Sequence, residues 1–438
     1  MNLNYRSYLH FDKKLPIRKA KKYLKDLSHH EYLPFITYEI PKHKWDNNHI
    51  YLKESRIISI CSHKDNYVYQ YFNNKINNQY EAYIRNIDID KNICAFRKKI
   101  GKCNVDFAKE ALTYITSHDS CYVIIADISK FFDNLDHKIL KNNLKKVLNV
   151  TELSADIYKM FKSITKTSYL TIDDIYQILK QEGFCISISQ KKNLYKDINE
   201  FGKKYNWQTI LTKEMFKKYK NTYIKPTKEE LKIKSKGIAQ GAPISGTLSN
   251  IYMIDFDKKV NELVNKLDGK YLRYCDDFLI AIPNFNDSNF NNLINNINSL
   301  IKEINLEIKK EKYQLYIYQN KQVINLNNNN KNKRIQFLGL ELNDNNEITI
   351  RRSTQDRNRN KKLKIIKRLY GNIEDIRTII YKRTIEDGPI GDYNNYTYGN
   401  YQSKVADKIG GQKLKMIKKK EIEFIDKHLK KNQKKAKI

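Results

Sequence analysis

The sequence is poor in cysteine, proline, glycine and tryptophan. Its 438 residues include 6 Cys, 7 Pro, 14 Gly and 2 Trp. The cysteines show no Cys-x-x-Cys spacing and no matching histidine pattern, which predicts a reduced protein without a disulfide framework or structural zinc. No run approaches the roughly 18 apolar residues of a membrane-spanning helix, and the first residues lack the apolar stretch of a signal peptide. We therefore expect a cytoplasmic protein without a membrane partner.

Acidic residues are scarce relative to basic ones. The chain has 82 Lys and Arg against 49 Asp and Glu, a formal net charge of +33. A surface of that charge attracts polyanions and binds phosphate backbones without regard to sequence. An anionic membrane would also attract it, but the missing apolar run argues against a spanning segment. Nucleic acid is the expected partner.

One pair of adjacent acidic residues lies in the segment Tyr274-Cys275-Asp276-Asp277. The flanking residues 271–272 and 278–282 are apolar and β-type, so the acids fall on the turn of a predicted hairpin. Neighbouring carboxylates repel each other, and neither ionises freely. A shared divalent cation relieves this repulsion, and hard oxygen ligands suit Mg²⁺. Taken alone, the pair has a solvated turn as its alternative interpretation.

A third carboxylate, Asp127, ends the apolar run 122–126, which predicts a buried strand. An acid at the end of a core strand is a poor choice for packing, and it makes sense if the side chain faces a cleft. Asp133 and Asp136 follow in a turn that leads into a helix. We interpret them as helix-starting and helix-capping residues, with a chemical role as the alternative.

The segment 236–252 lies between these acids and contains Gly237, Gly241 and Gly246, three of only 14 glycines. Glycine permits close approach of the backbone to a ligand and unusual φ values. A glycine-rich lead into a helix N-terminus suits phosphate or nucleotide binding. A plain loop-to-helix transition would look similar.

In this order, the three segments resemble the palm of reverse transcriptases. That palm has a first aspartate followed by paired aromatics, then a Gln-Gly loop and helix, then a Tyr-x-Asp-Asp hairpin. Downstream, residues 335–342 resemble the turn with which family members hold the primer end. Upstream, residues 95–102 resemble the fingers element that contacts the incoming triphosphate. The resemblance spans residues 90–350, most of the chain.

One departure bears on the subfamily. The chain has Ser245-Gly246 where group II intron and retroviral enzymes usually have Ser-Pro. The sequences of residues 240–252 and 101–111 resemble the bacterial abortive-infection and defence-associated reverse transcriptases more than the group II intron and retroviral enzymes. That resemblance implies a role in antiphage defence.

The family resemblance implies nucleotidyl transfer with two Mg²⁺ ions, Mn²⁺ being the alternative metal. Asp127 and Asp276 are then expected to bridge both ions, with Asp277 in support. The carbonyl of Ile128 is an expected further oxygen ligand. Catalysis would rest on positioning and charge stabilisation rather than on a protein nucleophile.

Further roles follow from motif position in the family. Phe132, five residues after Asp127, is expected to exclude a ribose 2′-hydroxyl, and one ring of the pair Phe131 and Phe132 to lie in the core. The lysines of 309–312 include a candidate proton donor to pyrophosphate, with a solvated helix end as the alternative. The other expected contacts are with the triphosphate for Arg97 and Lys98, with the nucleotide or template for Gln240, Gly241 and Tyr274, and with the primer for Phe337, Leu338 and Gly339.

The implied fold is α+β: a right-hand polymerase with an antiparallel-sheet palm, helical fingers and a helical basic thumb. Residues 1–90 are expected to form an N-terminal extension and the start of the fingers. Residues 91–350 would hold the fingers and palm, with 150–235 as fingers plus an insertion. Residues 351–438 carry 25 Lys and Arg against 10 Asp and Glu, which suits a thumb that contacts duplex phosphates.

Periodicity also predicts individual elements. The expected strands are 32–40 and 57–60, and the expected helices of the insertion are 172–179 and 201–219. Basic helices are expected over 361–370 and 413–430, and a solvated loop over 325–333.

The expected function is RNA-templated DNA synthesis in antiphage defence. The expected partners are a dedicated structured non-coding RNA, a DNA product and deoxynucleoside triphosphates. Relatives in that group often assemble into oligomers, so a homo-oligomer is a further expectation. The alternatives are an intron- or element-associated reverse transcriptase, a template-independent DNA polymerase and, least favoured, a non-catalytic RNA-binding protein. The intact trio of aspartates argues against the last, since drift would not preserve three costly acids in a cleft.

Overall fold

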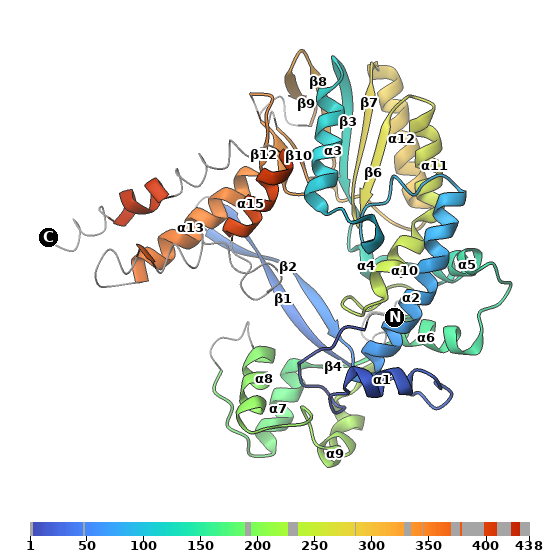
Figure 1. The fold of residues 1–438 in the computed structure, drawn as a ribbon, viewed down its shortest axis with the longest axis vertical. Helices are drawn as coiled ribbons and strands as arrows, with labels where there is room; N and C mark the ends of the chain where they lie inside the picture. Colours follow the sequence, from blue (N-terminus) through green and yellow to red (C-terminus); the bar gives the residue numbers. More distant parts are fainter. Residues whose placement is uncertain are drawn as a thin grey trace. The chain divides into compact units, whose positions relative to one another are not determined.

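The computed structural model describes residues 3–46, 49–188, 194–226, 235–284, 286–327, 334–343, 345–368, 377–378, 398–409 and 422–429. They form two compact units, each assembled from separate stretches of chain (Figure 1). Unit 1 contains Met1–Asp90, Ile128–Lys259 and Asn298–Glu307, and unit 2 contains Lys91–Asp127, Val260–Ile297 and Ile308–Ile438. Helices α11 (Ile254–Asn265) and α12 (Asp287–Glu303) contribute residues to both.

Unit 2 is built on a five-stranded sheet in the order β6-β7-β3-β8-β9. Every neighbouring pair in this sheet is antiparallel. The strands are β3 (Ser120–Asp127), β6 (Lys270–Tyr274), β7 (Asp277–Pro283), β8 (Gln314–Gln319) and β9 (Gln322–Asn325). The predicted buried strand is thus the central one, and the predicted hairpin forms β6 and β7.

Helical residues cover both faces of β3, which explains its continuous apolar run. Val123 and Ile125 belong to a core cluster with helix α3 (Asn104–Thr116). On the opposite face, the ring of Tyr122 lies 4.9 Å from that of Phe290 in α12. Because successive side chains of a strand alternate between faces, a strand covered on both sides needs apolar residues at every position.

A smaller sheet packs against the other side of α3. It has the order β10-β11-β12, with β10 (Ile335–Phe337), β11 (Leu340–Leu342) and β12 (Ile348–Ile350). Leu340 and Leu342 join the core cluster that α3 shares with the five-stranded sheet. The remaining named elements of unit 2 are the 3₁₀ helices η1 (Lys98–Ile100) and η3 (Lys310–Lys312) and the helices α13 (Arg352–Arg368) and α15 (Tyr398–Ile409).

Unit 1 combines helices with a four-stranded sheet in the order β2-β1-β4-β5. The strands are β1 (Phe35–Asp46), β2 (His49–Ile60), β4 (Ser168–Thr171) and β5 (Lys225–Pro226). Strand β1 pairs antiparallel with β2 and parallel with β4. The helices are α1 (Ile17–Tyr23), α2 (His63–Asn86), α4 (Phe131–Asn134), α5 (His137–Leu148), α6 (Ala155–Thr165), α7 (Ile172–Gln181), α8 (Leu194–Lys204), α9 (Lys213–Tyr223) and α10 (Ser245–Tyr252).

The expectation of one helix over 201–219 is wrong. Helix α8 ends at Lys204 and α9 begins at Lys213. Asn206 has a φ of 53°, a left-handed conformation that ends a helix. The Thr212 side chain then accepts a hydrogen bond from the Met215 backbone at 3.2 Å and caps α9. Local cap chemistry therefore overrides a continuous amphipathic pattern.

Other expectations are met in part. The two β-type runs of the N-terminal region belong to 12-residue strands, longer than predicted. The helix over 172–179 is confirmed as α7. Much of the expected loop 325–333, and residues 369–370 and 413–421 of the expected basic helices, lie outside the described residues. In the part of the chain that is described, no helix is long and apolar enough to cross a membrane.

Candidate active site

Three carboxylates meet at one end of the five-stranded sheet of unit 2. Asp127 is the last residue of β3, and Asp277 is the first of β7. The two residues are direct partners in the antiparallel register, which places their Cβ atoms about 5 Å apart. Asp276 precedes Asp277 on the turn. Strand pairing therefore brings the distant Asp127 next to the adjacent pair.

The turn that carries Asp276 is a two-residue hairpin loop. Tyr274 pairs with Asp277, so Cys275 and Asp276 form the connection. Cys275 has a φ of 61°, the left-handed conformation that tight hairpins need at their first central position. Burial, and next the charge of Asp276, raise the pKa of the Cys275 thiol. The thiol therefore stays protonated and acts as a small packing residue.

A buried arginine supports this turn, and the sequence analysis missed it. Arg273 is fully buried, and its Nη1 donates to the Cys275 carbonyl at 3.0 Å. The backbone of Arg273 also bonds to Asn92 and Cys94, each at 2.8 Å. A guanidinium can brace a carbonyl-rich turn because it offers five donors in a fixed fork. The available signal was a charged residue between the apolar Leu272 and the Tyr274 that precedes the acids.

The electrostatics of the three carboxylates are unfavourable without a cation. Asp127 is 5% exposed. Among the described residues its Oδ1 has no hydrogen-bond partner, and the Lys309 ammonium lies 3.9 Å from this oxygen. Burial, and next the charges of Asp276 and Asp127, raise the pKa of Asp277 to about 7. The cluster thus resists carrying its full negative charge.

A lysine supplies positive charge at this point. The Lys312 ammonium, which follows from η3, contacts Asp127 Oδ2, and the Lys309 backbone donates to the Asp127 carbonyl at 2.9 Å. Lys312 also opposes the rise in the Asp277 pKa. The segment 309–312 is therefore tied to the acids rather than forming a solvated helix end.

The three carboxylates are ligands of the type that binds a divalent cation, but their side chains are not arranged around one metal position. Carboxylate oxygens are the ligands that Mg²⁺ prefers. The unpartnered buried oxygen of Asp127 and the raised pKa of Asp277 both mark a place that favours a cation. Within the described residues, however, no group of three His, Cys, Asp or Glu side chains is already arranged around one metal position. The donor set fits, and the side chains would have to turn from lysine to metal.

The expected primer turn is a two-residue hairpin loop in the same unit. Leu338 and Gly339 have φ values of 46° and 95°, as tight hairpins require. The Asn104 side chain of α3 donates to the Leu338 carbonyl at 3.1 Å. Leu338 and Tyr274 both pack against the core cluster around α3, while Phe337 is buried within it. One core therefore positions the turn 337–339 and the hairpin that carries the acids.

The two expected triphosphate contacts differ in exposure. Lys98 is exposed at the start of η1. Arg97 is only 7% exposed, and its Nη1 donates to the Ile93 carbonyl at 2.8 Å. Arg97 therefore makes a structural contact with the backbone that the sequence did not predict.

Aromatic residues after Asp127 divide as expected. In unit 1, Phe131 is buried at 3% exposure and Phe132 is only partly buried. Asp136 caps α5 by accepting from the Lys138 and Ile139 backbones, which confirms its interpretation as a cap. Asp133 lies exposed in α4. The side chain of Ile128 is buried at 1% exposure.

The Gln-Gly loop of unit 1 lies against strand β2. The Gln240 carbonyl accepts from the Ser59 backbone at 2.8 Å. Gly241 has a φ of 126°, and a Cβ at this position would lie 2.6 Å from the Ser59 carbonyl oxygen. No other residue could occupy this position without strain. Glycine is thus required here for close backbone packing.

Comparison with known families identifies a domain within the chain. Residues 190–342 match the family model described as reverse transcriptase (RNA-dependent DNA polymerase). These residues are similar to that family. The matched residues include Gln240, Asp276, Asp277 and the turn 337–339, whereas Asp127 lies outside them. The expected α+β polymerase fold is confirmed. The match favours the expected enzyme class, an RNA-directed DNA polymerase.

Solved telomerase structures are among those similar to this chain. Telomerase from Candida albicans in complex with the TWJ fragment of telomeric RNA is 14% identical, with a TM-score of 0.44 over 90% of this chain and 55% of that one. Apo telomerase from Candida tropicalis is 15% identical, with a TM-score of 0.41 over 83% of this chain and 59% of that one. The chain thus spans less than two thirds of these telomerases. No curated protein matches the sequence.

Proposed function

We propose that this chain catalyses RNA-templated DNA synthesis by two-metal nucleotidyl transfer. The observation that carries the proposal is the direct pairing of Asp127 with Asp277 in the antiparallel register, with Asp276 on the adjoining turn. The match of 190–342 to the reverse transcriptase model supports it. Three carboxylates at one sheet end, one of them with its pKa raised to about 7, are hard to explain as packing residues.

Asp127 and Asp276 would hold two Mg²⁺ ions, or Mn²⁺ in their place, with Asp277 in support. When bound, such ions activate the attacking 3′-hydroxyl and stabilise the leaving pyrophosphate. The protein holds the acids in register through β3 and β7 and braces the turn through Arg273. Lys312 remains next to Asp127, where its ammonium balances charge whenever the acids are not otherwise neutralised.

Substrate contacts are assigned by motif position. Phe132 discriminates against ribonucleotides, because a bulky ring leaves no room for a 2′-hydroxyl. The turn 337–339 holds the primer end and shares its core with Tyr274. The other contacts are proposed for the exposed Lys98, for Arg97, for the carbonyl of Ile128, and for Gln240 and Gly241.

The proposed biological role is antiphage defence with a dedicated structured non-coding RNA. The amino-acid sequences of residues 240–252 and 101–111 resemble those of the defence-associated reverse transcriptases, and this resemblance supports the role. The net charge of +33 suits tight retention of such an RNA. Deoxynucleoside triphosphates are the substrates, DNA is the product, and self-association is part of the proposal.

Sequencing of the product tests the activity. The full chain is purified with the nucleic acid that it retains, then supplied with deoxynucleotides and Mg²⁺. DNA complementary to one co-purified RNA, absent with Asp276→Asn, supports the proposal. Asp133→Asn, which removes an equal charge at an exposed position of α4, is the matched control and should synthesise normally.

Two results would contradict the proposed RNA-templated DNA synthesis. Homopolymer or random product would indicate template-independent synthesis. No product with any template would favour an RNA-binding protein without catalysis.

The defence role has its own test. Cells that express the chain are challenged with phages beside cells that express Asp276→Asn. A drop in plaque number that requires Asp276 supports defence. Templated synthesis without protection would favour an intron- or element-associated enzyme instead.

A further inference from the structure

Helices α5 and α6 of unit 1 present an exposed tyrosine between two lysines. Tyr158 in α6 is 37% exposed. The Nζ of Lys141 in α5 lies 4.8 Å from the centroid of its ring, and that of Lys162 in α6 lies 4.7 Å from it. Each ammonium makes a cation–π contact, which is worth about 0.5–1 kcal/mol at an exposed site. Two positive charges thus converge on one open aromatic ring.

These two ammoniums lack acidic partners. Within the described part of the chain, neither Lys141 nor Lys162 forms an ion pair with a carboxylate. Several other exposed lysines of unit 1 do, as Lys146 does with Asp255 at 2.8 Å. Like charges near one another repel, so the pair favours an anion that could lie between them.

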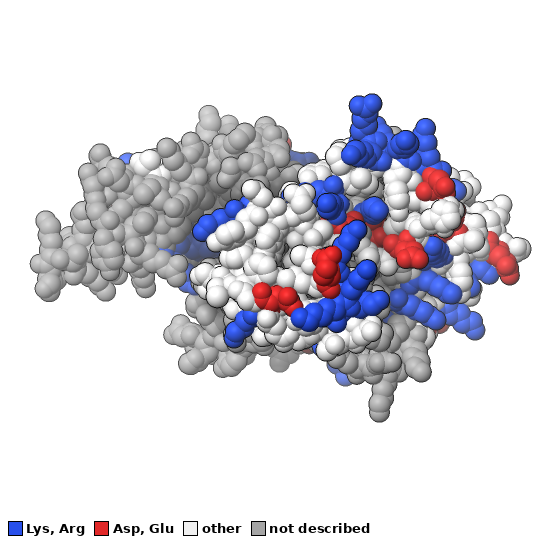
Figure 2. Space-filling view, turned by 90° about the horizontal axis from the view of Figure 1, so that it is seen from below, with Lys and Arg blue, Asp and Glu red and all other residues white. Residues whose placement is uncertain are grey.

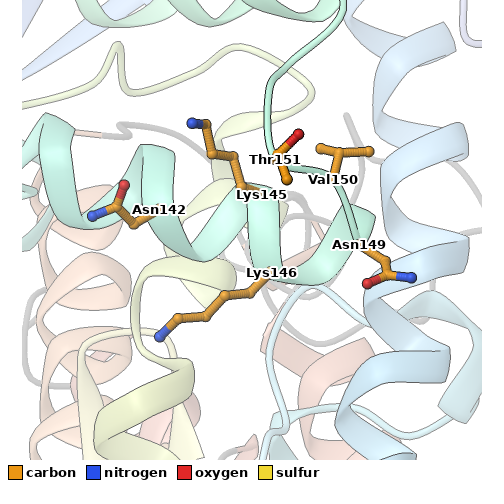
Figure 3. A pocket seen from close by; sticks show the side chains of 6 residues that line it. All are labelled: Asn142, Lys145, Lys146, Asn149, Val150 and Thr151. Carbon is orange, nitrogen blue, oxygen red and sulfur yellow. The ribbon is translucent and has the colours of Figure 1, made fainter.

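A shallow depression adjoins this pair on α5. Its volume is about 480 Å³, and it is lined by Asn142, Lys145, Lys146, Asn149, Val150 and Thr151. Lys145 follows Lys141 by four residues and so lies on the same helix face. In Figure 3, Lys145 and Thr151 extend from one side of the helix, whereas Lys146 extends away from them. The depression therefore adds a third ammonium, amides and a hydroxyl beside the tyrosine.

We propose that Lys141, Lys145, Tyr158 and Lys162, here called the α5–α6 surface, bind single-stranded nucleic acid. The ammoniums contact successive phosphates, and a base stacks on the Tyr158 ring. Flat rings among cations are how proteins bind single strands without reading their sequence. Val150 is the one exposed large apolar side chain of the depression, too little to anchor a membrane.

This surface goes beyond the polymerase proposal, because binding here requires none of the three aspartates. It would hold a strand of template or product on unit 1. RNA and DNA share the chemistry that it recognises, a phosphate chain with unpaired bases. The experiment distinguishes them.

Fluorescence anisotropy with the full chain tests the surface. The probes are labelled RNA and DNA strands about 12 nucleotides long, within the site sizes of single-strand binders. Lys141→Gln combined with Lys162→Gln should weaken binding about tenfold and reduce the salt dependence of log K by about 1.4, the value for two lost phosphate contacts. Tyr158→Ala should also weaken binding, whereas Tyr158→Phe should keep it. A larger loss for one probe identifies the strand.

The control removes the same charge elsewhere in unit 1. Lys19→Gln combined with Lys22→Gln alters two exposed lysines of α1 and should change the affinity by less than twofold, about the size of surface effects. Strands carrying 4-thiouridine should crosslink to α6 residues in the native chain. Equal losses in both double variants, or crosslinks only outside α5 and α6, would overturn the proposal. So would binding to anionic vesicles that depends on the same lysines while strand binding does not.

Discussion

At the scale of residues, the contact between Asp127 and Lys312 shows how the protein balances the charge of a buried acid. Asp127 has little solvent to stabilise its charge, and one of its oxygens has no hydrogen-bond partner among the described residues. The Lys312 ammonium, on a side chain that is 46% exposed, supplies positive charge from a partly solvated position. Such a partner can be displaced at low cost, which suits an acid that must exchange one cation for another.

Lys312→Met should therefore destabilise the metal-free protein and increase its response to Mg²⁺. Loss of the ammonium leaves Asp127 without its nearest positive charge, at a cost of about 1 kcal/mol for a half-exposed pair. Thermal unfolding with and without Mg²⁺ measures both effects. Lys310→Met, at an exposed position of the same 3₁₀ helix, is the control. Equal changes in melting temperature in the two variants would show that Lys312 does not stabilise Asp127.

His10 of unit 1 predicts a pH dependence of stability. The fully buried ring accepts from the Phe11 backbone at Nδ1, at 2.8 Å, and Nε2 lies 3.1 Å from the Ile60 carbonyl. Both contacts suit a neutral ring whose proton is on Nε2. Burial lowers the His10 pKa to about 4; nearby Asp12 opposes the shift and His63 adds to it. Below pH 6.5 the unfolded chain therefore binds a proton that the folded chain does not.

Stability should fall as the pH drops from 8 to 5, by about 2 kcal/mol for this group. Urea unfolding across that range measures the loss. His10→Gln should flatten the slope, although His63, whose pKa burial also lowers, adds a similar dependence. An unchanged slope in His10→Gln would contradict the assignment.

At the scale of elements, Gly241 couples the Gln-Gly loop to strand β2. The loop and strand touch through backbone atoms, with the Ser59 amide bonded to the Gln240 carbonyl. A side chain at Gly241 would both overlap the strand and strain the backbone. The loop conformation is thus set by β2, far from it in sequence.

Gly241→Ala should destabilise unit 1 by about 3 kcal/mol, from a strained φ together with a backbone overlap. Gly183→Ala is the matched control in the same unit. Gly183 also has a positive φ, of 84°, but nothing lies within 4 Å of its built Cβ, so its cost is about 1 kcal/mol. Urea unfolding of both variants compares them. Equal costs would show that the overlap is relieved by a shift of β2.

Strands, helices and caps could be predicted from the sequence wherever a single local pattern determines the structure. The apolar run before Asp127 specified a core strand, and Asp136 was recognisable as a cap. The break near Asn206 was missed because an amphipathic pattern continues across it. The burial of Arg97 and the contact of Lys312 with Asp127 could not be predicted, since both depend on which distant segments the fold brings together. The domain boundaries expected at residues 90 and 350 stay a prediction.

At the scale of the whole molecule, positive charge dominates. The net charge is +33, and basic side chains outnumber acidic ones on the face that Figure 2 shows. Charge of this kind gives affinity without specificity, so sequence selection has to come from base pairing with a template. We therefore expect changes that abolish DNA synthesis to leave the affinity for the template unchanged.

Chelation of divalent metal should abolish synthesis while leaving template binding intact. Binding should weaken by roughly 10³-fold or more between about 50 and 200 mM salt if six to ten phosphates are contacted. Asp276→Asn should bind with the same salt slope as the native chain and synthesise nothing. Anisotropy and primer extension on the same preparations measure both. Loss of binding on chelation would show that metal holds the template.

The sheet of unit 2 also dictates when the protein can first become active as it is made. Its central strand waits for partners encoded far downstream, and Lys312 follows Asp127 by 185 residues. At translation rates of about 5–20 residues per second, that interval lasts roughly 10–40 s. Until residues 277–283 are made, the strand that ends in Asp127 has neither β7 nor β8 beside it, and its apolar edges are open to a chaperone or to another nascent chain. A chain that ends before Asp276 carries one aspartate of the three, so such incomplete chains should be inert.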